Sequence, residues 1–240
     1  MTKKKSQKNH NSKGKANRKK LVPKEPRFST NTKLTIAMVA LVILGLAGVI
    51  YVANDAAPPA TASEDLLVRD DSHTLSVADD NKITLVEFLD FECEACGALY
   101  PTMERLKSEY EGRFTFVVRY FPLPGHANAD PAARAVEAAA KQGRFEDMYQ
   151  KMFETQPQWG EKQESQEPVF LGYAEELGLD MEQFTADMAD PATAERVRKD
   201  VEDGTALGVT GTPTIFVNGE RVDQAGYETL KNLFDAELGN

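Results

Sequence analysis

The order of apolar and polar residues divides the 240-residue chain into parts with different patterns. The first 33 residues are almost entirely polar, and an unbroken apolar run follows at residues 34–52. From about His73 to the C-terminus, short strand-like and helix-like patterns alternate. The pattern therefore predicts a tail, one membrane-spanning helix and a single folded domain over residues 73–240, which is long enough to bury an ordinary core.

The apolar run has the length of a transmembrane helix. Residues 34–52 are 19 residues without a charge, dominated by Leu, Ile, Val and Ala. At about 1.5 Å per residue they span roughly 28 Å, close to the hydrocarbon thickness of a bilayer. A cleaved signal peptide is the alternative, with a passable cleavage site at Ala60-Thr61-Ala62. The length of the run favours an uncleaved signal anchor, and in either case the domain that follows is exported.

The basic tail predicts the orientation of this helix. Residues 1–33 carry 12 Lys or Arg and one acid, a net charge of +11, whereas the whole chain carries −10, so residues 34–240 carry −21. Lysine clusters also bind nucleic acid, but a basic flank beside an apolar span is typical of the cytoplasmic side. We predict a disordered cytoplasmic tail, no nucleic-acid partner and a single-pass protein of the cell membrane. Residues 53–72, rich in Ala, Thr, Ser and Pro, predict an extracytoplasmic linker.

The domain begins with a strand–helix–strand pattern. Ile83–Phe91 is β-branched and aromatic, as in a buried central strand. Apolar residues then recur at helical spacing from Cys93 to about Tyr110, and Arg113–Phe121 predicts a second strand. Because a helix joins the two strands, we expect them to be parallel.

A block of helices follows, over about residues 131–207. Asp130 precedes Pro131, an arrangement that predicts an N-cap. Residues 156–167 are polar and predict a loop in which only Trp159 packs, and Asp190 predicts the cap of the last helix of the block.

The C-terminal part predicts a hairpin and a closing helix. Thr214–Val217 is strand-like, and Asn218-Gly219 is the dipeptide of a two-residue turn, so Glu220–Val222 should pair antiparallel with it. Apolar residues from Tyr227 to Leu238 then recur at helical spacing. The expected fold class is α/β.

The only two cysteines, Cys93 and Cys96, stand between the first strand and its helix. A zinc site or an iron–sulfur cluster needs about four ligands, and the histidines, at 10, 73 and 126, are isolated. A permanent disulfide would close too small a loop to contribute much stability. The position instead favours a redox dithiol, in which the N-terminus of the helix stabilises the Cys93 thiolate and Cys96 resolves the mixed disulfide.

The domain resembles the DsbA-like thiol–disulfide oxidoreductases, bacterial members of the thioredoxin superfamily with a helical insertion in the fold. The resemblance spans about Ile83–Leu238. The motifs that carry it are Phe91-Glu92-Cys93-Glu94-Ala95-Cys96-Gly97, Phe121-Pro122-Leu123-Pro124-Gly125-His126, Gln142-Gly143-Arg144-Phe145 and Gly211-Thr212-Pro213-Thr214-Ile215-Phe216-Val217-Asn218-Gly219. It implies no cofactor and no metal.

The resemblance also implies roles for individual residues. The first cysteine of such a pair is the nucleophile, and the residue that matches Pro213 forms a cis peptide bond against the disulfide; the alternative is an ordinary turn proline. Thr212, just before it, would pair its backbone with an extended substrate strand. Glu87 matches a buried acid beneath the active site that relays a proton to or from Cys96, or else lies on an edge strand facing solvent.

One departure from the family pattern changes the expected chemistry. Glu94-Ala95 stands between the cysteines, where DsbA-like sites usually carry Pro or His, and Asp90 and Glu92 are close in sequence. Negative charge opposes formation of the Cys93 thiolate, so we expect a less oxidising disulfide.

The combined prediction is an outward-facing oxidoreductase that forms disulfides in secreted or surface proteins. The resemblance implies a membrane redox partner of the DsbB or vitamin K epoxide reductase type. A reductase or isomerase is the alternative within this class, since Thr212 resembles the residue found at that place in some isomerases. A redox-inactive protein-binding or chaperone module is the alternative from another class.

Overall fold

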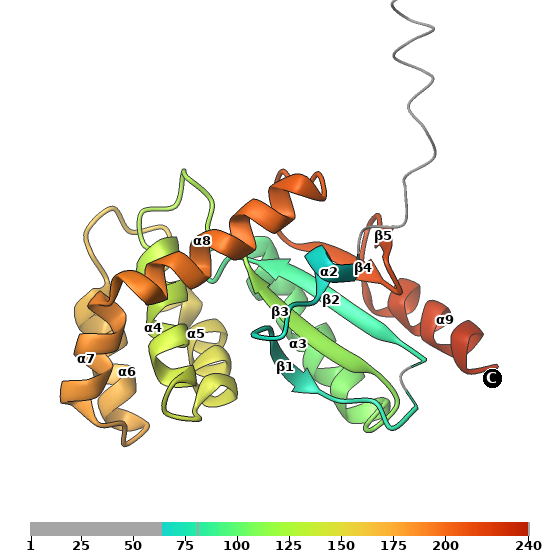
Figure 1. Cartoon of the computed structure of the whole chain (residues 1–240), viewed down its shortest axis with the longest axis horizontal. Helices are drawn as coiled ribbons and strands as arrows, with labels where there is room; N and C mark the ends of the chain where they lie inside the picture. The colour runs from blue at the N-terminus through green and yellow to red at the C-terminus, as the bar shows by residue number, and fades with distance from the viewer. Residues whose placement is uncertain (1–63, 81, 240) are drawn as a thin grey trace, which may run out of the picture. The chain divides into compact units, whose positions relative to one another are not determined.

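A computed structural model describes residues 64–80 and 82–239, which fold around a mixed sheet of five strands (Figure 1). In order across the sheet, the strands are β1 (His73–Ser76), β3 (Thr115–Tyr120), β2 (Thr84–Leu89), β4 (Thr214–Val217) and β5 (Glu220–Val222). β2 is therefore the central strand, with a hydrogen-bonded neighbour on either side.

The predicted strand–helix–strand unit is confirmed. Helix α3 (Glu94–Glu109) joins β2 to β3, and the two strands pair in parallel, with Leu85 opposite Phe116 and Leu89 opposite Tyr120. β1 pairs antiparallel with the outer edge of β3 and was not predicted, because four residues with one buried position are too short to show a period.

The C-terminal hairpin and helix have the predicted bounds. β4 pairs antiparallel with both β2 and β5, and α9 (Tyr227–Leu238) ends the described chain. The turn residues Asn218 and Gly219 both have positive φ, 49° and 84°, as a two-residue hairpin turn requires. Local turn chemistry is thus sufficient to define this part of the fold.

A block of helices interrupts the unit between β3 and β4. Figure 1 shows the helices of this block gathered beside the sheet, except for the last one, which extends from them over the sheet. They are α4 (Ala129–Ala140), α5 (Phe145–Trp159), α6 (Glu167–Glu176), α7 (Met181–Ala189) and α8 (Pro191–Ala206). The predicted insertion over about residues 131–207 matches these bounds closely.

Two details of this block differ from the prediction. The N-cap of α4 is Asn128, not Asp130, which lies inside the first turn. The expected loop at 156–167 begins later, because α5 continues through Pro157 to Trp159. The Trp159 side chain is fully buried and packs edge-on against Phe170, with 4.9 Å between ring centroids, so tertiary packing extends the helix in spite of its polar composition.

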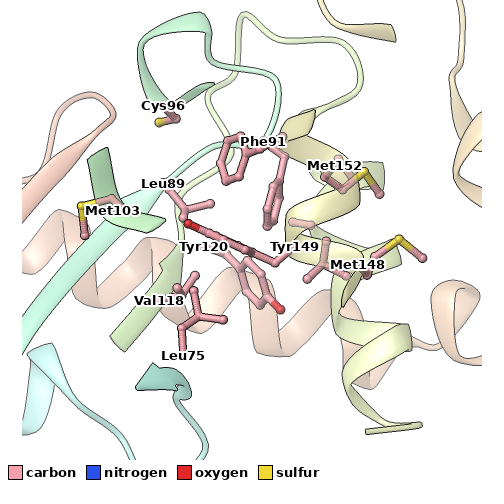
Figure 2. Packing of buried hydrophobic residues seen from close by; sticks show 14 of the residues in the cluster. Leu75, Leu89, Phe91, Cys96, Met103, Val118, Tyr120, Met148, Tyr149 and Met152 are labelled. Carbon is pink, nitrogen blue, oxygen red and sulfur yellow. The ribbon is translucent and has the colours of Figure 1, made fainter. Parts of the chain in front are cut away.

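Side chains that alternate along β2 pack on opposite faces of the sheet. Val86 and Phe88 belong to a small apolar cluster on one face, whereas Leu85 and Leu89 join the main core on the other face. Figure 2 shows that this main core continues from the sheet into the helical block. Within this main core, the ring centroid of Phe91 lies 6.3 Å from that of Tyr120 and 6.0 Å from that of Tyr149 on α5.

The last part of the predicted linker belongs to the folded domain. Glu64–Leu67 forms the short helix α2, in which Leu67 is buried. The guanidinium of Arg119 donates hydrogen bonds to the carbonyl oxygens of Leu66 and Leu67, at 2.7 and 2.8 Å. Four residues are too few to show a helical period, so the sequence pattern did not reveal this helix.

The remaining predictions for the N-terminal part fall on residues outside the described ones. These are the tail at 1–33, the transmembrane helix at 34–52 and the first part of the linker. Within the described ranges, no helix combines the length and the apolar character needed to cross a membrane.

Candidate active site

The two cysteines lie where β2 passes into α3. Cys93 is the N-cap residue of α3, with φ −68° and ψ 119°, and Cys96 lies in the first turn of the helix. Cys93 retains 8% of its surface exposed and Cys96 none, so only Cys93 is accessible to another protein. Both cysteines are free thiols in this structure.

The surroundings of Cys93 stabilise its thiolate. The pKa of Cys93 is lowered from 9.0 to about 5, first because Cys96 donates a hydrogen bond to it. Thr212 and the backbone N–H groups of Ala95 and Cys96 lower this pKa further, and partial burial opposes them. Free N–H groups at a helix N-terminus are the expected source of such stabilisation.

The surroundings of Cys96 have the opposite effect. Burial raises the pKa of Cys96 well above its usual value, and the neighbouring Cys93 and Glu87 raise it further. One cysteine of the pair is therefore an anion at neutral pH, whereas the other remains a thiol that donates to it.

Glu87 lies on the central strand beneath the dithiol. It lies two positions from both Leu85 and Leu89 and therefore points to the same face of the sheet as they do, the face that α3 covers. Its side chain is 2% exposed, and within the described residues its Oε2 has no hydrogen-bond partner. Burial, followed by repulsion from Cys93, raises the pKa of Glu87 to about 8. The alternative of a solvent-facing edge position is wrong.

The loop before β4 brings Thr212 and Pro213 to the dithiol. The Thr212–Pro213 peptide bond is cis, as the resemblance implied. In its protonated form, the Cys93 thiol donates a hydrogen bond to the carbonyl oxygen of Thr212 at 3.4 Å. The Thr212 hydroxyl is buried and has no hydrogen-bond partner among the described residues. It is therefore a donor available to the Cys93 thiolate.

The acids near Cys93 are buried and hydrogen-bonded to a neighbouring loop. Asp90 and Glu92 are both 2% exposed. The Asp90 carboxylate accepts from the Leu123 backbone N–H at 2.9 Å and lies 2.6 Å from His126 Nδ1, while Glu92 accepts from the backbone N–H of Asn128 at 2.6 Å.

These carboxylates hold the loop between β3 and α4. Any opposition from these acids to the Cys93 thiolate is outweighed, since Cys96, Thr212 and backbone N–H groups give a net downward shift of the pKa of Cys93. Spacing along the chain indicated that the acids were near but not where their oxygens point. His126, an isolated histidine in the sequence, pairs with the Asp90 side chain.

Sequence reasoning missed Gln156. This residue of α5 was placed in a loop, yet its side chain is 7% exposed and reaches the backbone on either side of Glu92. It also lines a pocket of about 500 Å³ beside the first turn of α3, with Gly97, Phe153 and Pro157. No local pattern indicates such a contact, because it joins residues 63 positions apart.

A stabilised thiolate at the start of a helix, a buried second thiol and a cis-proline loop meet on a sheet of this topology, and such an arrangement can carry out thiol–disulfide exchange. The chain belongs to the thioredoxin family: the model of the family described as thioredoxin matches residues 78–236. The predicted thioredoxin fold with a helical insertion is thereby confirmed for the described residues.

Solved structures with the same fold support this assignment. A thioredoxin-like oxidoreductase from Silicibacter pomeroyi DSS-3 is 27% identical, with a TM-score of 0.63, over 75% of this chain and 99% of its own. BdbD from Bacillus subtilis is 24% identical, with a TM-score of 0.61, over 69% of this chain and 92% of its own, which shows a common fold.

The match to curated relatives covers only part of this chain and a smaller part of each relative. A Na(+)/H(+) antiporter NhaA of Herminiimonas arsenicoxydans is 40% identical over 144 residues, which are 60% of this chain and 22% of that protein. The chain thus spans about a fifth of the length of the curated relatives it matches.

Proposed function

We propose that this protein forms disulfides in secreted or surface proteins, as an oxidase anchored in the membrane with its catalytic domain outside. The observation that carries the proposal is the asymmetry of the dithiol: the pKa of Cys93 is lowered to about 5, while that of Cys96 is raised. A stabilised thiolate favours the reduced form of the pair, and a pair whose reduced form is stabilised is a strong oxidant of other thiols.

The reaction needs only the two cysteines and the client. In the oxidised protein, a client thiolate attacks Sγ of Cys93, the Cys93–Cys96 bond breaks, and Cys96 leaves as a thiolate that takes up a proton. A second client thiolate then attacks the client sulfur of the mixed disulfide and expels the Cys93 thiolate. The client gains a disulfide, and the protein gains the two electrons as a reduced dithiol.

The groups around the dithiol assist these steps. Glu87, whose pKa is about 8, is protonated over much of the neutral range and is a proton donor for Cys96 as it leaves. The Thr212 carbonyl, which accepts from the Cys93 thiol, lies where an extended client strand would pair. Cys93 is the exposed member of the pair, so the client reaches the sulfur that departs as the more stable thiolate.

Renewed turnover requires a partner that reoxidises the pair. We propose a membrane quinone-linked protein of the DsbB or vitamin K epoxide reductase type, because the predicted anchor at residues 34–52 would hold both proteins in one bilayer. The basic tail at 1–33 supports the proposed orientation, since positive residues flank the cytoplasmic end of such spans.

The reduction potential of the Cys93–Cys96 pair tests the proposal. The full-length chain is equilibrated with glutathione buffers, and the fraction of free thiol is measured by mass spectrometry after alkylation. We expect a potential nearer to about −120 mV than to about −270 mV. A value near about −270 mV would overturn the oxidase assignment in favour of a reductase, and the absence of any reversible couple would leave only a binding module.

A further inference from the structure

We propose that Gln156 is a positioning residue for the dithiol: its side-chain amide holds the backbone around Cys93 in place and so stabilises the Cys93 thiolate. The proposal rests on the thiol–disulfide chemistry proposed above. It assigns a part in that chemistry to the helical block, which lies outside the strand–helix unit that carries the cysteines.

Both protons of the Gln156 amide are used on the active-site turn. Nε2 donates to the carbonyl oxygen of Phe91 at 2.7 Å and to that of Cys93 at 2.9 Å. The two carbonyls flank Glu92, so one amide group spans the whole turn between β2 and α3. The side chain is more than nine-tenths buried, so few water molecules could replace it.

These contacts fix the direction of Cys93. Its carbonyl oxygen also accepts from the N–H of Gly97 at 3.1 Å, the bond that begins α3. With this carbonyl held from two sides, the first-turn N–H groups of Ala95 and Cys96 remain directed at the Cys93 sulfur, as thiolate stabilisation requires.

Gly97 is the counterpart of Gln156. A Cβ at position 97 would lie 2.1 Å from Oε1 of Gln156. Gly97 is inside α3 and has an ordinary helical backbone, so alanine would otherwise be the better helix former there. A larger residue at position 97 must therefore displace the end of the Gln156 side chain, whose amide makes the two hydrogen bonds to the active-site turn.

The variant Gln156→Met keeps the volume of the side chain and removes both hydrogen bonds. Thiolate absorbance of the reduced full-length chain, titrated against pH, gives the pKa of Cys93. We expect this pKa to rise by about 0.5 to 1 and the potential to become less oxidising, with the native circular dichroism retained. An unchanged pKa in a folded Gln156→Met protein would overturn the proposal.

Gly97→Ala tests the same contact from the other side. We expect Gly97→Ala alone to raise the pKa of Cys93 as Gln156→Ala does, and the double variant to match Gln156→Ala with no further rise. Fully additive effects, or no effect of Gly97→Ala, would contradict the proposal. This comparison keeps the test valid if Gln156→Met fails to fold, because Gly97→Ala retains the native α5.

A matched control separates a positioning effect from general disturbance of α5. Gln150→Met changes another glutamine of the same helix, whose amide donates to Oε2 of Glu104 on α3 at 3.4 Å instead of to the active-site turn. We expect it to leave the pKa of Cys93 unchanged. Because the titration needs no client and no turnover, it still gives an answer if the chain proves to have no reversible dithiol couple, an outcome that would overturn only the proposed function.

Discussion

Sγ of Cys93 lies 3.4 Å from the carbonyl oxygen of Thr212, to which the protonated thiol donates, although 119 residues separate the two in the chain. This contact joins the start of α3 to the cis-proline loop before β4. The nucleophile is therefore held between two segments that are distant in sequence and adjacent in space, because β2 and β4 are neighbours in the sheet.

Replacing the resolving cysteine should trap the reaction halfway. In Cys96→Ser, the Cys93 thiolate attacks a peptide disulfide and releases one peptide thiol, but no second thiol of the protein can break the mixed disulfide that forms. Non-reducing electrophoresis should show a covalent adduct that a reductant removes. Cys93→Ser, in which only the buried thiol remains, should form none, and equal adduct in both variants would contradict the assignment of roles.

Thr212 should contribute to the acidity of Cys93 through its hydroxyl. Thr212→Val keeps the shape of the side chain and the backbone carbonyl but removes the donor, so the pKa of Cys93 should rise above about 5. Thr212→Ser retains a hydroxyl and should stay near the native value. Titration of the thiolate absorbance measures both, and indistinguishable variants would show that the hydroxyl has no effect.

Glu87 should make the stability of the domain depend on pH. Its pKa is about 8 in the folded chain against an ordinary value of 4.5, so between these values the folded state binds more protons than the unfolded state. The contribution of Glu87 to the free energy of unfolding therefore falls as pH rises from about 4.5 to about 8, by about 3–5 kcal/mol in total.

The variant Glu87→Gln removes this dependence. It should gain stability over the native chain as pH rises through that window, with little difference below about pH 4.5. Urea unfolding of both reduced proteins at a series of pH values measures the difference. A constant difference across the window would mean that Glu87 does not titrate there.

Arg119 should be far more important for stability than the exposed arginine on α8. Its guanidinium is fully buried and bonds Asp200 Oδ1 at 2.8 Å and Asp203 Oδ2 at 2.6 Å, in addition to the two carbonyls of α2. Arg119→Ala leaves the buried Asp200 carboxylate without this partner and should cost about 3–5 kcal/mol in denaturant unfolding. Arg198→Ala, which removes only exposed ion pairs, should have no measurable effect.

Elements with local signals could be predicted from the sequence. Asp190 caps α8 by accepting from the backbone N–H of Ala192, and the Asn218-Gly219 turn defines the hairpin, because each signal involves residues only a few positions apart. The dithiol was found for the same reason, since a strand that leads into a helix at Cys93 is a local pattern.

What the sequence could not show depends on distant contacts. Trp159 is helical because it packs on Phe170, and Gln156 acts at a turn 63 residues away. The direction of the Glu92 carboxylate, toward the backbone N–H of Asn128, depends on how the loop after β3 folds back. Charge along the chain identified the acids near Cys93 but not the hydrogen bonds that lower the pKa of Cys93.

The attachment of α2 to Arg119 has a mechanical consequence. Arg119 lies on β3, one strand from the centre of the sheet, and holds the carbonyls of Leu66 and Leu67. Arg69 adds a second attachment, to Asp203 on α8, at 2.9 Å. A pulling force applied at residue 64 is therefore borne by β3 in the interior of the sheet and by α8, and it does not act first on β1 at the sheet edge.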